Sequence, residues 1–335
     1  MKHKAGGERP NETLTAIPGV RVGHWTDREA ATGCTVVLFP EEGAVAGVDI
    51  RGGAPGARGA EPLRPGRLVP RIHALVFAGG SAFGLDAVGG AMRFLRERGV
   101  GLEIAGVRVP IVPGFNLFDL GVGRADRWPD ADAGYRACQA ATADPVEPGS
   151  VGAGTGATVG KVLGVEHATK GGLGSALCAQ GCWLVGALAV VNAFGDVLDP
   201  ATGRIVAGAR RPDGRGFLNT GELLTRGPLP ERFRAAPGAG ENTTLGVVVT
   251  NAALTKEEAL TVARAAQSGL ARVIAPVHTL GDGDAVVAAS CGEERAHPLV
   301  IGQMAAQALQ DAVLRAVRQA EGLGGVPAAR ELLGT

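Results

Sequence analysis

The sequence predicts an α+β fold in which helices are layered on β-sheets. Strand-length segments rich in Val, Leu and Ala recur through the 335 residues. Residues 299–320 predict an amphipathic helix long enough to cover a sheet, with one apolar face: Val300, Met304, Ala308, Val313 and Val317. Glycine accounts for 54 residues, about 16% against a usual value of roughly 7%. We expect these glycines to serve tight turns and close backbone contacts.

The charge balance excludes several classes of function. Lys plus Arg and Asp plus Glu each number 33, so we expect no nucleic-acid partner and no attraction to an anionic membrane. Residues 1–13 predict a polar tail, and no segment has the pattern of a signal peptide or a transmembrane helix. We therefore expect a cytoplasmic protein with reduced cysteines, and the length alone leaves the number of domains open.

The first part of the chain mixes strands and helices. Residues 19–26, 34–40 and 44–50 predict three short strands in a hairpin-like series. Residues 73–78 predict another strand, followed by a helix over residues 82–98 behind a Ser81 cap.

The middle of the chain contains the strongest break. Residues 108–120 look extended and residues 131–141 helical. Residues 183–206 predict a hairpin that turns at residues 199–203. From residue 209 to residue 241 Arg, Pro and Gly are frequent and the apolar residues lose their period, which predicts an exposed loop or irregular arm.

Regular structure resumes after this arm. Residues 243–250 predict a Val-rich strand, and Thr255-Lys256-Glu257-Glu258 is a capping box that opens a helix to about residue 271. Residues 285–290 predict a further strand ahead of the helix over residues 299–320.

Two glycine-rich motifs fall short of a nucleotide site. Gly152-Ala153-Gly154-Thr155-Gly156-Ala157 matches the dinucleotide pattern, but a turn precedes it where a strand is required. Gly160-Lys161 lacks the other residues of a P-loop, so the sequence predicts a glycine-rich turn that presents Lys161. We expect no cofactor.

The segment Asp282-Gly283-Asp284 does not continue as a calcium loop, because Val286 stands at the next ligand position and no glutamate closes the loop. We expect no metal. His278 permits a Thr/His/Asp triad with Thr243, although a histidine at the end of a strand or loop is more often structural.

Thr243 stands where the arm becomes a buried strand. A hydroxyl at such a junction can attack the preceding carbonyl, exchange the amide for an ester and, after hydrolysis, leave an N-terminal threonine. The new α-amine has a reference pKa of about 7.7 to 8.0, so it can act as the base. Taken alone, the segment also fits ordinary strand threonines.

Five segments in chain order carry a likeness more specific than any single motif: Ile17-Pro18-Gly19-Val20-Arg21-Val22-Gly23-His24, Thr32-Gly33-Cys34-Thr35-Val36-Val37, Gly47-Val48-Asp49-Ile50-Arg51-Gly52-Gly53-Ala54-Pro55-Gly56, Gly79-Gly80-Ser81-Ala82-Phe83-Gly84-Leu85 and Asn242-Thr243. Over about residues 14–320 the chain resembles the L-aminopeptidase/D-esterase family, with its β-peptidyl aminopeptidases and nylon-oligomer endo-hydrolases. The Asn-Thr junction is closer to the nylon-oligomer branch.

The resemblance implies a role for each matching residue. Thr243 would be the nucleophile freed by cleavage after Asn242, which gives fragments 1–242 and 243–335. Asn192 would be the oxyanion donor and Lys161 the cation beside the nucleophile. The remaining implied site residues are an acidic pair that orients the nucleophile, and a pocket position where the family often has tyrosine: Asp282, Asp284 and Phe118. Phenylalanine removes any role of that tyrosine hydroxyl.

The resemblance also implies a single domain over residues 14–330, folded as a four-layer αββα sandwich of the N-terminal-nucleophile kind, and a homotetramer or larger homo-oligomer. We expect hydrolysis of a small peptide, amide or ester that carries a free amino group, favoured by the charges of Asp282 and Asp284, with an apolar acyl side at Phe118. An endo-acting hydrolase of nylon-type oligomers is one alternative. Others are a threonine-dependent acyltransferase of the ornithine acetyltransferase type and a noncatalytic glycine-rich binding protein.

Overall fold

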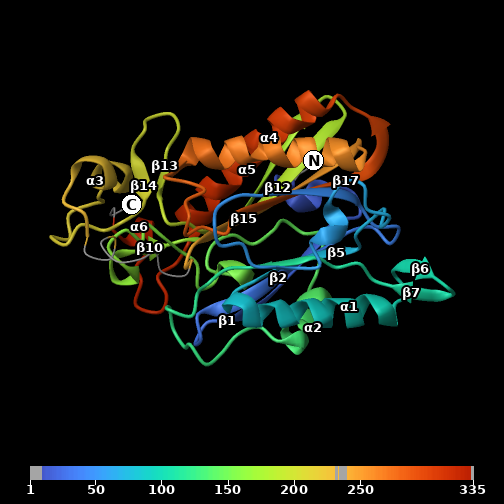
Figure 1. Cartoon of the computed structure of the whole chain (residues 1–335), viewed down its shortest axis with the longest axis horizontal. Helices are drawn as coiled ribbons and strands as arrows, with labels where there is room; N and C mark the ends of the chain where they lie inside the picture. Colours follow the sequence, from blue (N-terminus) through green and yellow to red (C-terminus); the bar gives the residue numbers. More distant parts are fainter. Residues whose placement is uncertain (1–9, 231–232, 234–239, 333–335) are drawn as a thin grey trace, which may run out of the picture.

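The computed structural model describes residues 10–230, 233 and 240–332 (Figure 1). These residues form a mixed α+β fold, as the sequence predicts, with two five-stranded sheets at its centre. The expected polar tail falls mostly on residues 1–9, which lie outside the described residues.

The first sheet has the strand order β1-β2-β5-β8-β4. β5 and β8 run parallel, and the other neighbours are antiparallel. The strands are β1 (Arg21–Asp27), β2 (Thr32–Leu38), β5 (Ala74–Ala78), β8 (Gly114–Asn116) and β4 (Ala57–Arg58).

The second sheet has the order β11-β12-β15-β17-β3, in which only β15 and β17 form a parallel pair. Its strands are β11 (Gly172–Gln180), β12 (Trp183–Asn192), β15 (Thr243–Ala253), β17 (Ala285–Arg295) and β3 (Val45–Ile50). The predicted hairpin-like series is therefore wrong in part. β1 and β2 pair, but β3 leaves for the second sheet, because its apolar residues pair with a strand some 240 positions away.

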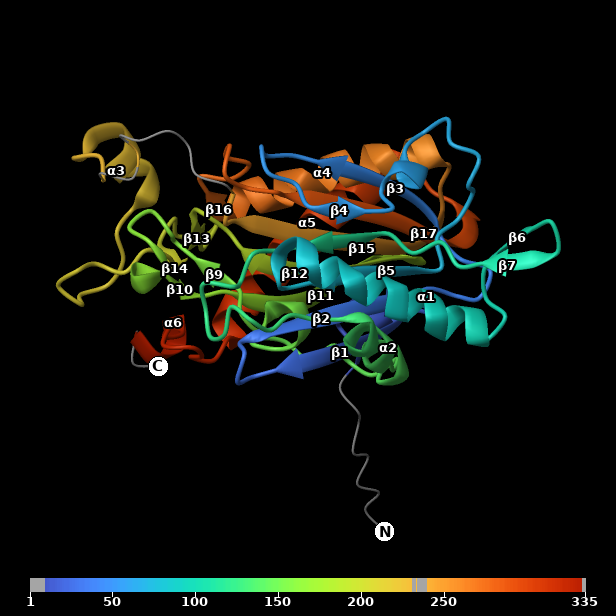
Figure 2. The same ribbon diagram turned by 60° about the horizontal axis from the view of Figure 1, so that its bottom comes forward.

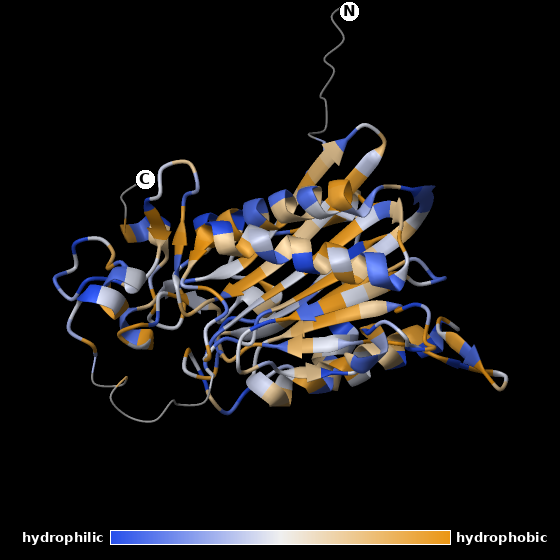
Figure 3. Ribbon diagram, turned by 45° about the horizontal axis from the view of Figure 1, so that its top comes forward, coloured by the Kyte–Doolittle hydropathy of each residue, from blue (hydrophilic) through white to orange (hydrophobic). Residues whose placement is uncertain are grey.

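Helices cover the outer face of each sheet (Figure 2). One apolar cluster joins α1 (Ala87–Glu97) and α2 (Ala131–Gln139) to the first sheet. A second lies between the two sheets. A third joins the second sheet to α4 (Lys256–Val273) and α5 (Pro298–Gln319). Figure 3 shows the same pattern, with apolar strands beneath helices that are polar on one face.

Glycines allow the helices to approach the sheets closely, as expected. A Cβ on Gly23 of β1 would lie 2.0 Å from the carbonyl oxygen of Ala137 in α2. A Cβ on Gly174 of β11 would lie 2.1 Å from that of Ala312 in α5. Any larger side chain at these positions would push the helix away from the sheet.

The helices with local sequence signals form as predicted. Thr255 and Glu258 make the reciprocal capping box of α4, and α5 spans almost the predicted residues. The Ser81 cap is wrong: Ser81 opens a short 3₁₀ helix, η3 (Ser81–Asp86), with φ +55°, and its side chain caps nothing in the described residues. The turn after Gly80 uses the left-handed conformation, which the apolar pattern does not reveal.

Two other expectations need correction. The turn near Asp199 exists, but it joins β13 (Asp196–Leu198) to β14 (Ile205–Ala207), while β12 pairs with β11 and β15. The expected arm over residues 209–241 contains a short helix, α3 (Thr220–Arg226), which Asn219 caps at Glu222 N. Residues 231–232 and 234–239 of this arm lie outside the described residues.

The remaining elements are short and lie around the two sheets. They are β6 (Leu102–Ile104), β7 (Val107–Val109), β9 (Thr158–Val159), β10 (Thr169–Lys170), β16 (Ile274–Ala275), α6 (Ala329–Leu332) and the 3₁₀ turns η1 (Leu14–Ala16), η2 (Glu61–Leu63), η4 (Gly152–Gly154) and η5 (Val165–His167). Across the described ranges, the helices are all too short or too polar to cross a bilayer.

Candidate active site

Thr243 is the first residue of β15, in the middle of the second sheet, and is only 5% exposed. It pairs across the sheet with Asn192, the last residue of β12. Its hydroxyl donates to the carbonyl oxygen of Asn242 at 2.5 Å. The register of two Val-rich strands thus places the predicted nucleophile beside the predicted oxyanion donor and against the carbonyl that precedes it.

Lys161 and Asn192 form one buried network. The Lys161 ammonium donates to Asn192 Oδ1 at 2.8 Å and to the Asn192 carbonyl oxygen at 3.0 Å. Asn192 Oδ1 also accepts from the Thr158 N–H at 3.0 Å, which fixes the amide with Nδ2 as its donor. Burial lowers the pKa of Lys161 to about 7, although the charges of Asp282 and Glu241 oppose this shift.

Two donors converge on one carbonyl of the arm. Asn192 Nδ2 and Lys161 Nζ each lie 3.2 Å from the carbonyl oxygen of Glu241. This is the arrangement that an oxyanion requires. In the continuous chain, the backbone just before Thr243 occupies it.

The acidic pair holds the backbone around the junction. Asp284 accepts from the Thr244 N–H at 2.6 Å, and Asp282 accepts from the Phe194 N–H at 3.2 Å. Burial and the neighbouring Asp284 raise the pKa of Asp282 to about 6. Neither Asp282 nor Asp284 is among the described residues that line the two cavities beside Phe118, so these charges no longer support the choice of a free amine.

Gly283, between the two aspartates, contacts the junction directly. Its N–H donates to the Asn242 carbonyl oxygen at 2.9 Å, the same oxygen that the Thr243 hydroxyl approaches. A Cβ on Gly283 would lie 2.4 Å from the Ala54 carbonyl oxygen, so glycine is required for this close approach.

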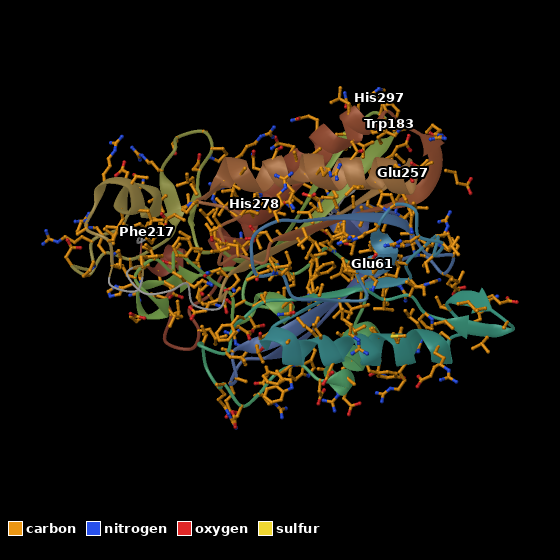
Figure 4. The ribbon with its side chains drawn as sticks, viewed as in Figure 1. Glu61, Trp183, Phe217, Glu257, His278 and His297 are labelled. Atoms are coloured by element: carbon orange, nitrogen blue, oxygen red, sulfur yellow. The ribbon has the colours of Figure 1, made fainter. Side chains whose placement is uncertain are left out.

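His278 contacts Asp284. The sequence alone does not decide whether this histidine belongs to a triad with Thr243 or is structural. Its Nδ1 lies 2.8 Å from Asp284 Oδ2, and its backbone N–H donates to the same oxygen at 3.1 Å. His278 therefore positions Asp284, which in turn holds the residue after Thr243. In Figure 4, His278 is labelled below α4 and α5.

A second buried pair, Asp119 and Lys170, was missed by sequence reasoning. These two residues hold the segments whose neighbouring residues, Phe118 and Thr158, bind Asn192. Asp119 accepts from the Gly80 N–H at 2.6 Å and from the Thr32 hydroxyl at 2.8 Å. The Lys170 ammonium donates to the carbonyl oxygens of Thr155 and Ala157, each at 2.7 Å. Burial raises the pKa of Asp119 to about 6 and lowers that of Lys170 to about 7, while the attraction between the two opposes both shifts.

Phe118 lies between two cavities and lines both. Its carbonyl oxygen accepts from Asn192 Nδ2 at 3.1 Å, so this position contacts the predicted oxyanion donor through its backbone. The larger cavity, of about 650 Å³, has charged lining residues: Asp119, Lys161, Glu166 and Glu241. The smaller, of about 380 Å³, contains Thr243. Across the described ranges, no cluster of His, Cys, Asp and Glu could hold a metal ion.

Comparison with known proteins gives the chain its family. Residues 12–330 match the family described as Peptidase family S58. An uncharacterized aminopeptidase of Mycobacterium leprae is 40% identical, over 95% of this chain and 93% of its own length. A 6-aminohexanoate-oligomer endohydrolase of a Kocuria species is 29% identical, over 90% of this chain and 85% of its own length.

Solved structures share the fold. A Burkholderia β-aminopeptidase superposes with a TM-score of 0.68 at 22% identity, over 99% of this chain and 95% of its own. The L-aminopeptidase D-Ala-esterase/amidase of Ochrobactrum anthropi, described as a variant of the N-terminal-nucleophile hydrolase fold, superposes with a TM-score of 0.71 at 19% identity, over 97% and 91%. The chain therefore belongs to peptidase family S58 and is a hydrolase of amide or peptide bonds.

Proposed function

We propose that the protein is a self-processing amide hydrolase in which Thr243 is first the processing nucleophile and then the N-terminal catalytic residue. The observation that carries this proposal is the contact between the Thr243 hydroxyl and the Asn242 carbonyl, 2.5 Å between oxygens, at a carbonyl that also accepts the Gly283 N–H. A hydroxyl in this place is close to the carbon that it must attack, and the Gly283 N–H is placed to stabilise the oxyanion.

Processing then follows ordinary acyl chemistry. Thr243 Oγ forms a bond to the Asn242 carbonyl carbon, the C–N bond breaks, and the proton of the hydroxyl passes to the nitrogen of Thr243. Water hydrolyses the resulting ester and leaves the Asn242 carboxylate and the Thr243 α-amine. The products are fragments 1–242 and 243–335.

Turnover uses the same hydroxyl with its new base. The α-amine takes the proton of Thr243 Oγ as that oxygen attacks the substrate carbonyl, and the Asn192 side-chain amide donates to the oxyanion. The proton then passes to the leaving amine, and water attacks the acyl ester. The neighbouring Lys161 ammonium favours the neutral form of the α-amine.

The mass of the purified protein tests processing. The 33.8 kDa chain, divided in the proportion 242 to 93, gives pieces of about 24 and about 9 kDa. Thr243→Ser keeps a hydroxyl and should still cleave, whereas Thr243→Ala should stay in one piece. Cleavage of the alanine variant at this bond would remove Thr243 from the processing step.

For the substrate, we propose a short peptide, amide or ester with an unblocked amino group. The larger cavity supports this class because two acidic residues, Glu166 and Glu241, are in its lining, and negative charge there would favour an ammonium. The aminopeptidase relatives point the same way. Rates on matched free and N-acetylated substrates test it, and we expect the acetylated ones to be several times slower. Equal rates would favour the second candidate, an endo-acting hydrolase, which the oligomer endohydrolase relatives suggest.

The proposal also covers the fold, the assembly and the location of the protein. Two sheets pack face to face, and each has helices on its other face. This arrangement supports an αββα sandwich of the N-terminal-nucleophile kind over a single domain of residues 14–330. The homotetramer or larger assembly and the cytoplasmic location stay predictions from the sequence. Sedimentation of the purified enzyme measures the first of these.

A further inference from the structure

The smaller cavity, which we call the neutral pocket, differs in chemistry from the larger one. Its described lining carries no charged side chain and includes Leu85, Phe118 and three residues with polar side chains, Ser81, Asn116 and Thr243. Its side-chain polar groups are two hydroxyls and one amide. A charged substrate group placed here would lose its water without gaining a counter-charge.

Asn116 is the amide of this pocket. It is the last residue of β8, it is 8% exposed, and its backbone N–H donates to the Gly56 carbonyl oxygen at 3.2 Å. Its side-chain Oδ1 is buried and has no hydrogen-bond partner among the described residues. By contrast, Asn192 nearby has both ends of its amide engaged. A buried amide with an unused end is costly in a folded protein, and a ligand amide would satisfy it.

Ser81 gives a second sign that the pocket is built to bind. It has φ +55°, a backbone conformation that non-glycine residues rarely adopt and that concentrates at ligand sites. Its N–H donates to the Leu117 carbonyl oxygen at 2.9 Å, which fixes this turn against the residue that follows Asn116. The turn places a second hydrogen-bonding side chain in the lining of the pocket beside Asn116.

We propose that the neutral pocket binds an uncharged secondary or primary amide of the substrate through Asn116, with Ser81 beside it. An amide offers both a carbonyl acceptor and an N–H donor, so it suits the Asn116 side chain in either orientation. This inference rests on the proposed function. If the substrate amine lies in the larger cavity with Glu166, the neutral pocket receives the leaving side. The enzyme then prefers substrates with a second amide after the scissile bond over those that end there in a carboxylate.

Three substrates with the same free-amine acyl residue and the same scissile amide test this inference. Their leaving sides end in a carboxamide, a carboxylate, or a branched alkyl group of similar size. For the wild-type enzyme we expect kcat/KM for the carboxamide to exceed that for the carboxylate by about 10-fold or more. Asn116→Leu should lower kcat/KM for the carboxamide by about 5- to 10-fold and leave the alkyl substrate within about 2-fold.

Asn116→Asp provides an isosteric second variant. It should turn the leaving side toward cations, so that a substrate ending in an aminoethyl group becomes better than the carboxamide. Glu166→Gln is the matched control, because it should change the ratio of free-amine to acetylated substrate and leave the carboxamide-to-carboxylate ratio as it is. Mass spectra should first show that each variant has cleaved at Asn242.

The outcomes separate the two proposals. An equal loss on all three substrates in Asn116→Leu, or a wild-type preference for the carboxylate, would overturn the role of the neutral pocket. Failure of the wild-type chain to cleave at Asn242 would overturn the proposed function instead. Equal rates on free and acetylated substrates, with the effect of Asn116 intact, would overturn only the placement of the amine.

Discussion

At the residue scale, the site depends on one asparagine that is held at both ends of its amide. Thr158 N–H and Lys161 Nζ bind Asn192 Oδ1, so Nδ2 must point toward the carbonyl of Glu241. A donor fixed before the substrate arrives costs no reorganisation when the oxyanion forms. The side chain of Asn192 is therefore expected to act on the transition state more than on the bound substrate.

Asn192→Ala tests this directly. Loss of one oxyanion donor typically lowers kcat by about 10² to 10³. We expect that loss with a nearly unchanged KM, measured by steady-state kinetics on protein that has already cleaved at Asn242. An unchanged kcat would move the role to backbone N–H groups.

Lys161 should set the lower pH limb of activity. Its pKa is lowered to about 7, so it is charged below that pH, and under the proposed mechanism its charge would make the α-amine of Thr243 easier to deprotonate. Activity should therefore rise from about pH 6 to about pH 8, below or at the reference value of the amine. In Lys161→Met the limb should move toward higher pH, as a pH profile of kcat/KM would show. A processed variant with the same rate and limb would exclude the lysine from the mechanism.

Much of the candidate site can be proposed from the sequence, because its residues lie in short motifs. Asn242, Thr243, Asp282 and Asp284 stand at an arm-to-strand junction and in an acidic turn that the resemblance identifies. The support from Asp119 and Lys170 has no such signal, because each side chain binds backbone groups of other segments. That contact exists only once the sheets have packed.

At the element scale, two segments bind the two ends of the Asn192 amide: the loop that carries Phe118, and strand β9, which begins at Thr158. The buried pair of Asp119 and Lys170 holds both segments. Asp119 follows Phe118, whose carbonyl accepts from Asn192 Nδ2. Lys170 holds the carbonyl of Ala157, next to Thr158, whose N–H binds Asn192 Oδ1. We expect both residues to be positioning residues for the oxyanion donor.

A double-mutant cycle measures this coupling. Asp119→Asn and Lys170→Met should each lower kcat by about 10-fold with little change in KM, and neither should lower it further in an Asn192→Ala background, since residues in one network are not additive. Equal losses in both backgrounds would show a general structural defect. Circular dichroism serves as the folding control.

Elements differ in how well the sequence specifies them. α4 and α5 are predicted almost to their ends because a capping box and an apolar stripe are local signals. The partners of β3 and β12 are not, because strand pairing across hundreds of residues is decided by which apolar faces meet in the packed sheets.

At the scale of the whole molecule, the proposed cut falls in the centre of the structure. β15, which begins at Thr243, lies between β12 and β17, and α5 packs on the same sheet. We expect the two fragments to elute together in native size-exclusion chromatography and to separate only in denaturant. Separation under native conditions would contradict the central place of β15.

The hydrogen bonds from Asn192 and Lys161 to the Glu241 carbonyl have a consequence for the proposed maturation of the enzyme. The uncleaved chain presents its own backbone at the proposed oxyanion site, and Thr243 is buried at the start of a central strand. One copy is therefore not expected to cleave the junction of another. Maturation should then be an intramolecular, first-order reaction whose half-time stays the same when the protein is diluted, and each molecule should gain activity only after its own single cut.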